Sequence, residues 1–184
     1  MRKPIILLAM ILASAFAIAQ VAPDGEFYGS LGDFLLKNGQ NAAALSAYEE
    51  GLKAEPENKH ILNNLGYFHK DTNPMMAEEY FLLALQTDPD YEKARSNLAL
   101  LYSKNLDYEN AIVQLDLLAQ DFPKNINYNY DLAINYANRF YYISREVKDL
   151  DNAIKYFKIV YDMDKSFMFS MQNIKVLEDI KGGI

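Results

Sequence analysis

The sequence predicts an all-α protein, built as a solenoid of stacked helical hairpins. Three prolines recur at intervals of 33 and 34 residues: Pro56, Pro89 and Pro123. An alanine stands 12 residues before each of them: Ala44, Ala77 and Ala111. Self-similarity at such a period is typical of a supersecondary unit that is repeated and stacked. No run of alternating apolar and polar residues is long enough to predict a strand.

Each repeated unit has the pattern of two antiparallel helices. In the second helix a large apolar residue follows the alanine by four positions: Tyr48, Phe81 and Leu115. The first helix has an apolar cluster around a small residue: Gly32, Gly66 and Ala99. Small residues let paired helices touch, and the proline then helps to end the second helix because it cannot continue the hydrogen-bond ladder.

A fourth unit departs from this pattern. Leu132, Ala133 and Tyr136 match a first helix, while Ala153 and Phe157 match a second one. The two alanines are 20 residues apart, against 12 between Gly32 and Ala44, and Lys165 stands in the place of the proline. The stretch 138–149 contains no Gly or Pro. We therefore expect the insertion to lengthen the helices.

Residues 166–181 are predicted to form a capping helix, which a solenoid needs because its last unit exposes an apolar face. Four apolar residues of this segment have helical spacing: Phe167, Met171, Ile174 and Leu177. Gly182 and Gly183 then end the helix.

The repeated residues resemble the tetratricopeptide repeat (TPR), in which an aromatic residue, Leu-Gly, Tyr, Ala, an aromatic residue and Pro recur over 34 positions. The resemblance divides one TPR domain, residues 20–184, into repeats at about 25–58, 59–91, 92–125 and 126–165, followed by the capping helix. It implies that the first helices line a concave groove for a protein or peptide partner.

By position, the resemblance assigns these residues to the groove: Asp33, Asn63, Tyr67, Lys70, Lys93, Ser96, Leu100, Ser103, Tyr130 and Ile134. Some relatives clamp the carboxylates of chaperone tails. Only Asn64 and Lys93 agree with that clamp, and Asp33 would repel a carboxylate. Chaperone tails are therefore not the expected ligand.

Tyr141 and Tyr142 lie in the insertion of the fourth unit, next to Phe140. Consecutive helical side chains point about 100° apart, so the three rings cannot all be buried against one neighbour. One hypothesis is that they pack on the lengthened helices. The other is that Tyr141 and Tyr142 anchor a partner, because Tyr is enriched at binding hot spots.

The N-terminus has the composition of a secretory signal peptide over residues 1–19. Arg2 and Lys3 precede an apolar run, and Ala17-Ile18-Ala19 forms a small-residue exit. We expect cleavage before Gln20 and a periplasmic or secreted protein. The alternative is an uncleaved segment that anchors the chain to a membrane, which is the one condition under which we expect a membrane contact.

The composition argues against catalysis and nucleic-acid binding. The net charge of −7 disfavours nucleic acid, and the absence of cysteine excludes disulfides and thiolate chemistry. The two histidines, His60 and His69, are nine residues apart and lie on opposite faces of a helix. We therefore expect no enzyme activity, no catalytic residues, no metal and no cofactor.

These observations together predict an exported adaptor or scaffold that binds a peptide or partner protein through its groove. The alternative is a membrane-tethered structural component of a cell-envelope assembly.

Overall fold

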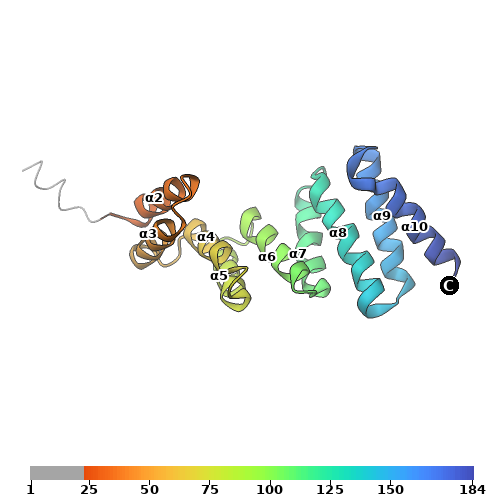
Figure 1. Ribbon diagram of the computed structural model, residues 1–184, viewed down its shortest axis with the longest axis horizontal. Helices are drawn as coiled ribbons and strands as arrows, with labels where there is room; N and C mark the ends of the chain where they lie inside the picture. Colours follow the sequence, from red (N-terminus) through yellow and green to blue (C-terminus); the bar gives the residue numbers. More distant parts are fainter. Residues whose placement is uncertain (1–22) are drawn as a thin grey trace, which may run out of the picture. The chain divides into compact units, whose positions relative to one another are not determined.

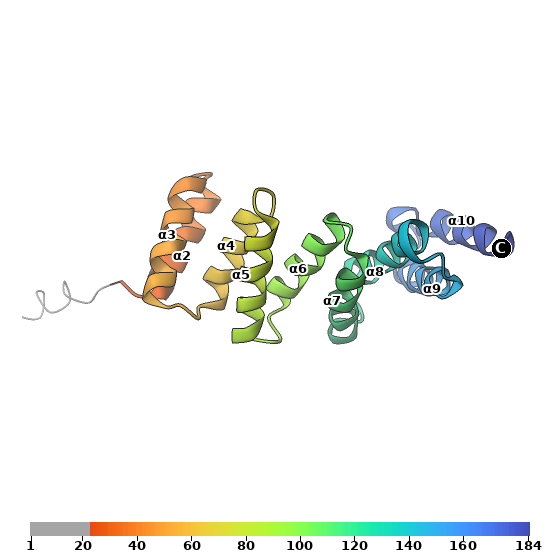
Figure 2. The ribbon, with the colours of Figure 1, turned by 90° about the horizontal axis from the view of Figure 1, so that it is seen from below.

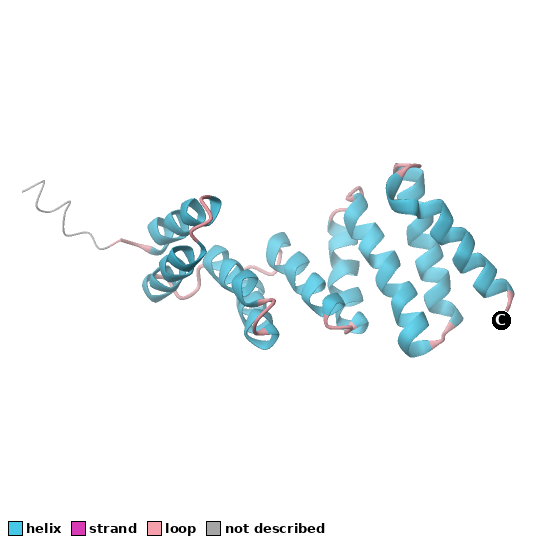
Figure 3. Cartoon of the chain, in the orientation of Figure 1, coloured by secondary structure: helices cyan, strands magenta, loops and turns pink. Residues whose placement is uncertain are grey.

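The computed structural model describes residues 23–184, so the predicted signal peptide lies outside the described residues. Helices are the regular structure of this part, and residues 23–184 contain no strand (Figure 3). The α-helices are α2 (Gly25–Lys37), α3 (Asn41–Ala54), α4 (Lys59–His69), α5 (Pro74–Thr87), α6 (Glu92–Lys104), α7 (Tyr108–Asp121), α8 (Ile126–Arg139), α9 (Val147–Met163) and α10 (Ser170–Gly182). A π-helix covers Phe140–Ser144 and a 3-10 helix covers Phe167–Phe169.

The chain forms two compact parts, an N-terminal part and a C-terminal part, which divide between Ile61 and Leu62, within α4. The word unit is kept for a single repeat. In the first unit, α2 and α3 lie side by side as an antiparallel pair (Figures 1 and 2). Gly32 is required at their contact, because a Cβ atom there would lie 2.4 Å from the fully buried ring of Tyr48. The predicted role of this small residue is confirmed.

The second unit repeats this contact. A Cβ atom on Gly66 of α4 would lie 2.6 Å from the ring of Phe81 of α5. Ala99 and Ala133 occupy the matching positions of α6 and α8, and both are buried. The predicted helical-hairpin solenoid is therefore the observed fold.

Side-chain caps fix where several helices begin. Asp24, Asn73, Asp107 and Asn125 each accept a hydrogen bond from a backbone N–H in the first turn that follows. Such caps satisfy amides that have no partner within the helix. The prolines of the repeat lie in the turns after α3, α5 and α7, as the pattern predicts.

The insertion of the fourth unit is helical, as expected. The chain passes from α8 into the π-helix, turns at Arg145 in the left-handed region (φ 55°), and enters α9 two residues later. The sequence did not predict the π-helix. Figure 1 shows α8, α9 and α10 side by side, and contacts between α8 and α9 and between α9 and α10 support this arrangement.

The capping helix is present, but it starts later than predicted. Phe169 adopts a left-handed conformation (φ 58°), which interrupts the helix, so that α10 begins at Ser170. Ile174 and Leu177 are buried as expected. Met171 is 46% exposed, so it does not belong to the buried face.

Candidate functional site

Within the C-terminal part, the first helices of three repeats (α4, α6 and α8) line one continuous groove. Its first hollow is bounded by Asn63, Tyr67, Glu92, Lys93, Ser96, Asn97 and Tyr128. A second, of about 140 Å³, is bounded by Ser96, Ala99, Leu100, Ser103, Leu115, Asp131, Ile134 and Asn135. A third is bounded by Lys70, Asn97, Leu100, Leu101, Ser103 and Lys104. Because neighbouring hollows share residues of α6, we treat them together as "the groove".

The helical period explains why α6 provides most of this surface. Lys93, Ser96, Leu100 and Ser103 are three or four residues apart, so they form one stripe along the helix. Eight residues that the sequence assigned to the groove are brought together there: Asn63, Tyr67, Lys70, Lys93, Ser96, Leu100, Ser103 and Ile134.

Asp33 belongs to the first unit, where its carboxylate already has hydrogen-bond partners. The Tyr48 hydroxyl donates to Asp33 Oδ1 at 2.5 Å, and His60 Nε2 lies 2.9 Å from Asp33 Oδ2. The structure therefore joins Asp33 to His60, a contact that the sequence did not predict.

Tyr130 is not among the residues that bound these three hollows. Its ring packs edge to face on Phe157 at 5.6 Å and on Phe167 at 5.4 Å between centroids, which places it against α9 and the C-terminal segment. The tyrosine that borders the groove is Tyr128, whose hydroxyl donates to Glu92 Oε1 at 2.6 Å. Tyr128 and Asp131 are three residues apart, so they share the stripe of α8 that borders the groove.

The middle of the groove is organised by amides and an aromatic ring. Asn97 Nδ2 donates to Asn63 Oδ1 at 2.8 Å. Asn63 is buried, so it positions Asn97 and does not itself present a large polar surface. Lys70 Nζ lies 3.4 Å from the centre of the Tyr67 ring, and this cation–π contact places a positive charge beside an exposed aromatic surface.

Asp131 provides a negative charge at the α8 side. No ion pair to Asp131 is formed within residues 23–184, and the residue as a whole is exposed. Its carboxyl group nevertheless lies in the concave wall, where loss of hydration raises its pKa to about 6. Burial, followed by the hydrogen bond to Glu92, raises the pKa of the neighbouring Tyr128 to about 12.

A second exposed surface lies at the π-helix. Phe140 is buried, whereas Tyr141, Tyr142 and Ile143 are 55%, 68% and 62% exposed. The ring of Tyr142 stacks on that of Tyr108 with 6.2 Å between centroids. Both candidate anchors thus remain accessible within the described part of the chain.

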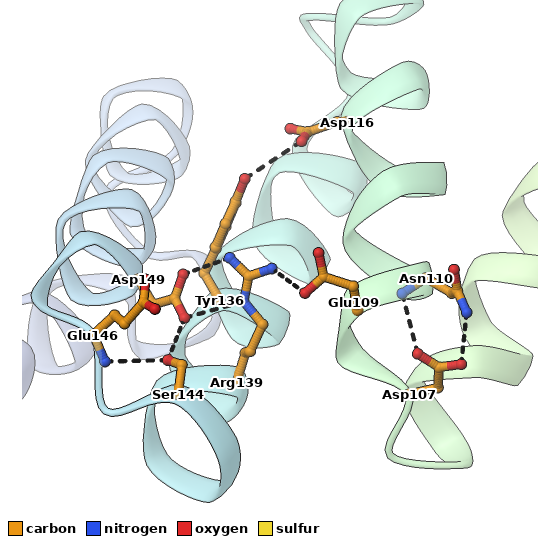
Figure 4. A network of polar contacts seen from close by, with 9 residues as sticks. All are labelled: Asp107, Glu109, Asn110, Asp116, Tyr136, Arg139, Ser144, Glu146 and Asp149. Atoms are coloured by element: carbon orange, nitrogen blue, oxygen red, sulfur yellow. Dashed lines mark hydrogen bonds and ion pairs between the residues drawn. The ribbon is translucent and has the colours of Figure 1, made fainter.

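A polar network holds the π-helix in place (Figure 4). Arg139 donates from Nε and Nη2 to the two oxygens of Asp149, at 3.0 and 2.5 Å, and from Nη1 to Glu109 at 2.6 Å. Ser144, the last residue of the π-helix, donates to Asp149 at 2.5 Å. Burial acts against ionisation of Asp149, but these hydrogen bonds dominate and hold its pKa below the usual range.

Neither a metal site nor a membrane span is found in residues 23–184. That part of the chain has no group of three or more His, Cys, Asp or Glu side chains suited to hold a metal ion. Its helices are also too short or too polar to cross a membrane.

Repeated antiparallel helices with a groove along the first helices define a helical-repeat scaffold. The model of the tetratricopeptide repeat family matches residues 25–58. That match identifies one tetratricopeptide repeat at residues 25–58, and the remaining helix pairs share its helical-hairpin fold.

Solved structures of MamA proteins share the fold. A crystal structure of MamA protein is 23% identical and has a TM-score of 0.73, with 86% of this chain and 82% of that chain covered. The structure of MamA residues 41 to the end from Desulfovibrio magneticus RS-1 is 18% identical, with a TM-score of 0.72 and coverage of 86% and 85%. A comparison of the sequence with curated proteins gives no match. At these identities the likeness concerns the fold alone.

Proposed function

We propose that this protein is a non-enzymatic adaptor that binds a segment of another polypeptide in the groove of its C-terminal part. The observation that carries the proposal is the continuous groove along α4, α6 and α8, lined by amides, hydroxyls, aromatic rings and aliphatic side chains.

The chemistry of the groove suits a peptide. The Asn97 amide and the serine hydroxyls of α6 can bond to peptide backbone groups, while Leu100 and Ile134 offer apolar contacts to side chains. Leu100 is 58% exposed, although it lies between the polar residues of the same stripe. A polypeptide with alternating apolar side chains would remove this surface from water.

The proposal can be tested with a displayed library of random peptides and the purified protein. We expect selected peptides to bind the native protein and to bind Leu100→Arg at least about tenfold more weakly, because the new charge is buried beneath the ligand. The matched control is Val113→Arg on α7, an exposed apolar residue outside the hollows that form the groove. Failure to select any peptide, or equal binding to Leu100→Arg, would contradict the proposal.

We also propose export to the periplasm or beyond the cell, on the basis of the signal-like residues 1–19. The competing proposal is a membrane-tethered component that keeps this segment. Mass spectrometry of the protein from its producing cells distinguishes the two. A chain beginning at Gln20 supports the exported adaptor, and a chain beginning at Met1 supports the tethered component.

A further inference from the structure

Asn135 is a polar residue at a position that is apolar in the preceding units. Relative to the small residues Gly66, Ala99 and Ala133, the same place is held by Phe68 in α4 and by Leu101 in α6. Asn135 is nevertheless 2% exposed and borders the 140 Å³ hollow of the groove. A buried amide at this place calls for a polar partner.

The orientation of the Asn135 amide is fixed by its one bond. Its Nδ2 donates to the backbone carbonyl of Asp131 at 2.8 Å. A carbonyl oxygen can only accept, so the nitrogen must face it and Oδ1 must point elsewhere. Within residues 23–184, Asn135 Oδ1 is buried and has no hydrogen-bond partner. It is an acceptor that lacks a donor.

The hollow combines further acceptors with an apolar wall. Asp131 contributes a carboxylate, and Ser96 and Ser103 contribute hydroxyl oxygens. Three aliphatic side chains complete the wall: Leu100, Leu115 and Ile134. The residues that line the hollow include no Lys, Arg or His, and no ion pair to Asp131 is formed within residues 23–184, so the hollow lacks a positive charge.

We infer that this hollow binds a lysine side chain of the partner polypeptide, with the ammonium group at Asp131 and Asn135 and the methylene stem against Leu100 and Ile134. The inference rests on the proposed peptide-binding function of the groove. Lysine combines a flexible aliphatic stem with a compact group of three donors. A bound ammonium would supply the missing donor to Asn135 Oδ1 and also favour the ionised form of the partly desolvated Asp131.

Two small probes test the hollow without a complete ligand: N-acetyl-lysine methylamide and its norleucine counterpart, which has an aliphatic side chain without the ammonium group. Binding is followed by amide NMR of the purified protein. We expect the lysine probe to bind at least about tenfold more tightly, as hydrogen bonds to charged groups predict. Saturable shifts should include the side-chain amide of Asn135.

Two variants assign the effect to the hollow. Asn135→Leu, which restores the residue type of the third unit, and Asp131→Asn should each weaken lysine binding about fivefold or more. Asp179→Asn removes the same charge from the exposed face of α10 and should leave binding unchanged. Asp131 is exposed, so its variant tests the inference even if Asn135→Leu impairs folding.

Equal binding of the two probes, or binding that is insensitive to both variants, would overturn the inference. Tighter binding of the arginine counterpart would overturn the choice of lysine. The peptides selected by display distinguish the two levels of the proposal. If they bind the groove but tolerate replacement of every lysine by norleucine, the lysine site fails while the peptide-binding function stands.

Discussion

Gly66→Ala should destabilise the second unit, although alanine is the better helix former. The added Cβ would lie 2.6, 2.7 and 3.0 Å from three carbons of the Phe81 ring, where ordinary carbon contacts are about 3.5–4.0 Å. The ring is completely buried and cannot turn away into solvent. Either the ring or the two helices must move by roughly 1 Å.

Overpacking of this kind costs about 1–3 kcal/mol, and the higher helix propensity of alanine offsets about 1 kcal/mol of it. We therefore expect a net loss of up to about 2 kcal/mol, or a fall in Tm of roughly 2–8 °C for a chain of this size. Leucine at position 66 should cost more, and the loss should extend to neighbouring units because repeats stabilise one another.

Thermal unfolding followed by circular dichroism measures the effect. The matched control is Gly182→Ala at the end of α10, where a Cβ would meet nothing within 4 Å. This control should keep or raise Tm. Adding Phe81→Leu to Gly66→Ala should cost less than the sum of the two single changes, because the smaller side chain relieves the clash. A Tm for Gly66→Ala that equals or exceeds that of the control would refute the assigned helix contact.

Three further predictions concern the fourth unit. Replacing Tyr141 and Tyr142 by Ser should change stability by less than about 1 kcal/mol, because both rings are largely exposed, and a loss of partner binding at unchanged Tm would identify them as anchors. Asp149→Asn should lower Tm by roughly 6–10 °C, since breaking a buried ion pair costs about 3 kcal/mol or more; an unchanged melting curve would contradict this role. The raised pKa of Asp131 means that the folded chain holds this proton up to about pH 6, whereas the unfolded chain releases it near pH 4. The contribution of Asp131 to folding stability should thus fall as pH rises from about 4 to about 6, while binding of the lysine probe should become tighter. The neighbouring Tyr128 stays neutral over this range. Asp131→Asn should remove the pH dependence of both stability and binding.

The sequence was sufficient to predict the fold because its signals are local and repeated. Gly32 and Gly66 mark the helix contacts, and the clashes that a Cβ atom would make there with Tyr48 and Phe81 explain why only a very small residue fits. Helix lengths in the insertion also followed from the absence of Gly and Pro. The π-helix did not, because it depends on Arg139 reaching Asp149, a contact between two helices.

The candidate site was predicted less completely. The stripe of α6 followed from helical spacing, but the choice between Tyr128 and Tyr130 depends on which ring the C-terminal segment covers. Asn135 was missed for a different reason. A polar residue at an apolar repeat position is a visible signal, but the unpaired oxygen that gives it meaning appears only in three dimensions.

The central claim is that the groove of the C-terminal part binds a polypeptide segment. The most direct measurement is an NMR shift map of the purified protein with a peptide selected by display. The account predicts saturable shifts that cluster on α4, α6 and α8, around Tyr67, Lys93, Leu100 and Ile134. Shifts confined to the exposed rings at Tyr141 and Tyr142, or to α10, would contradict it.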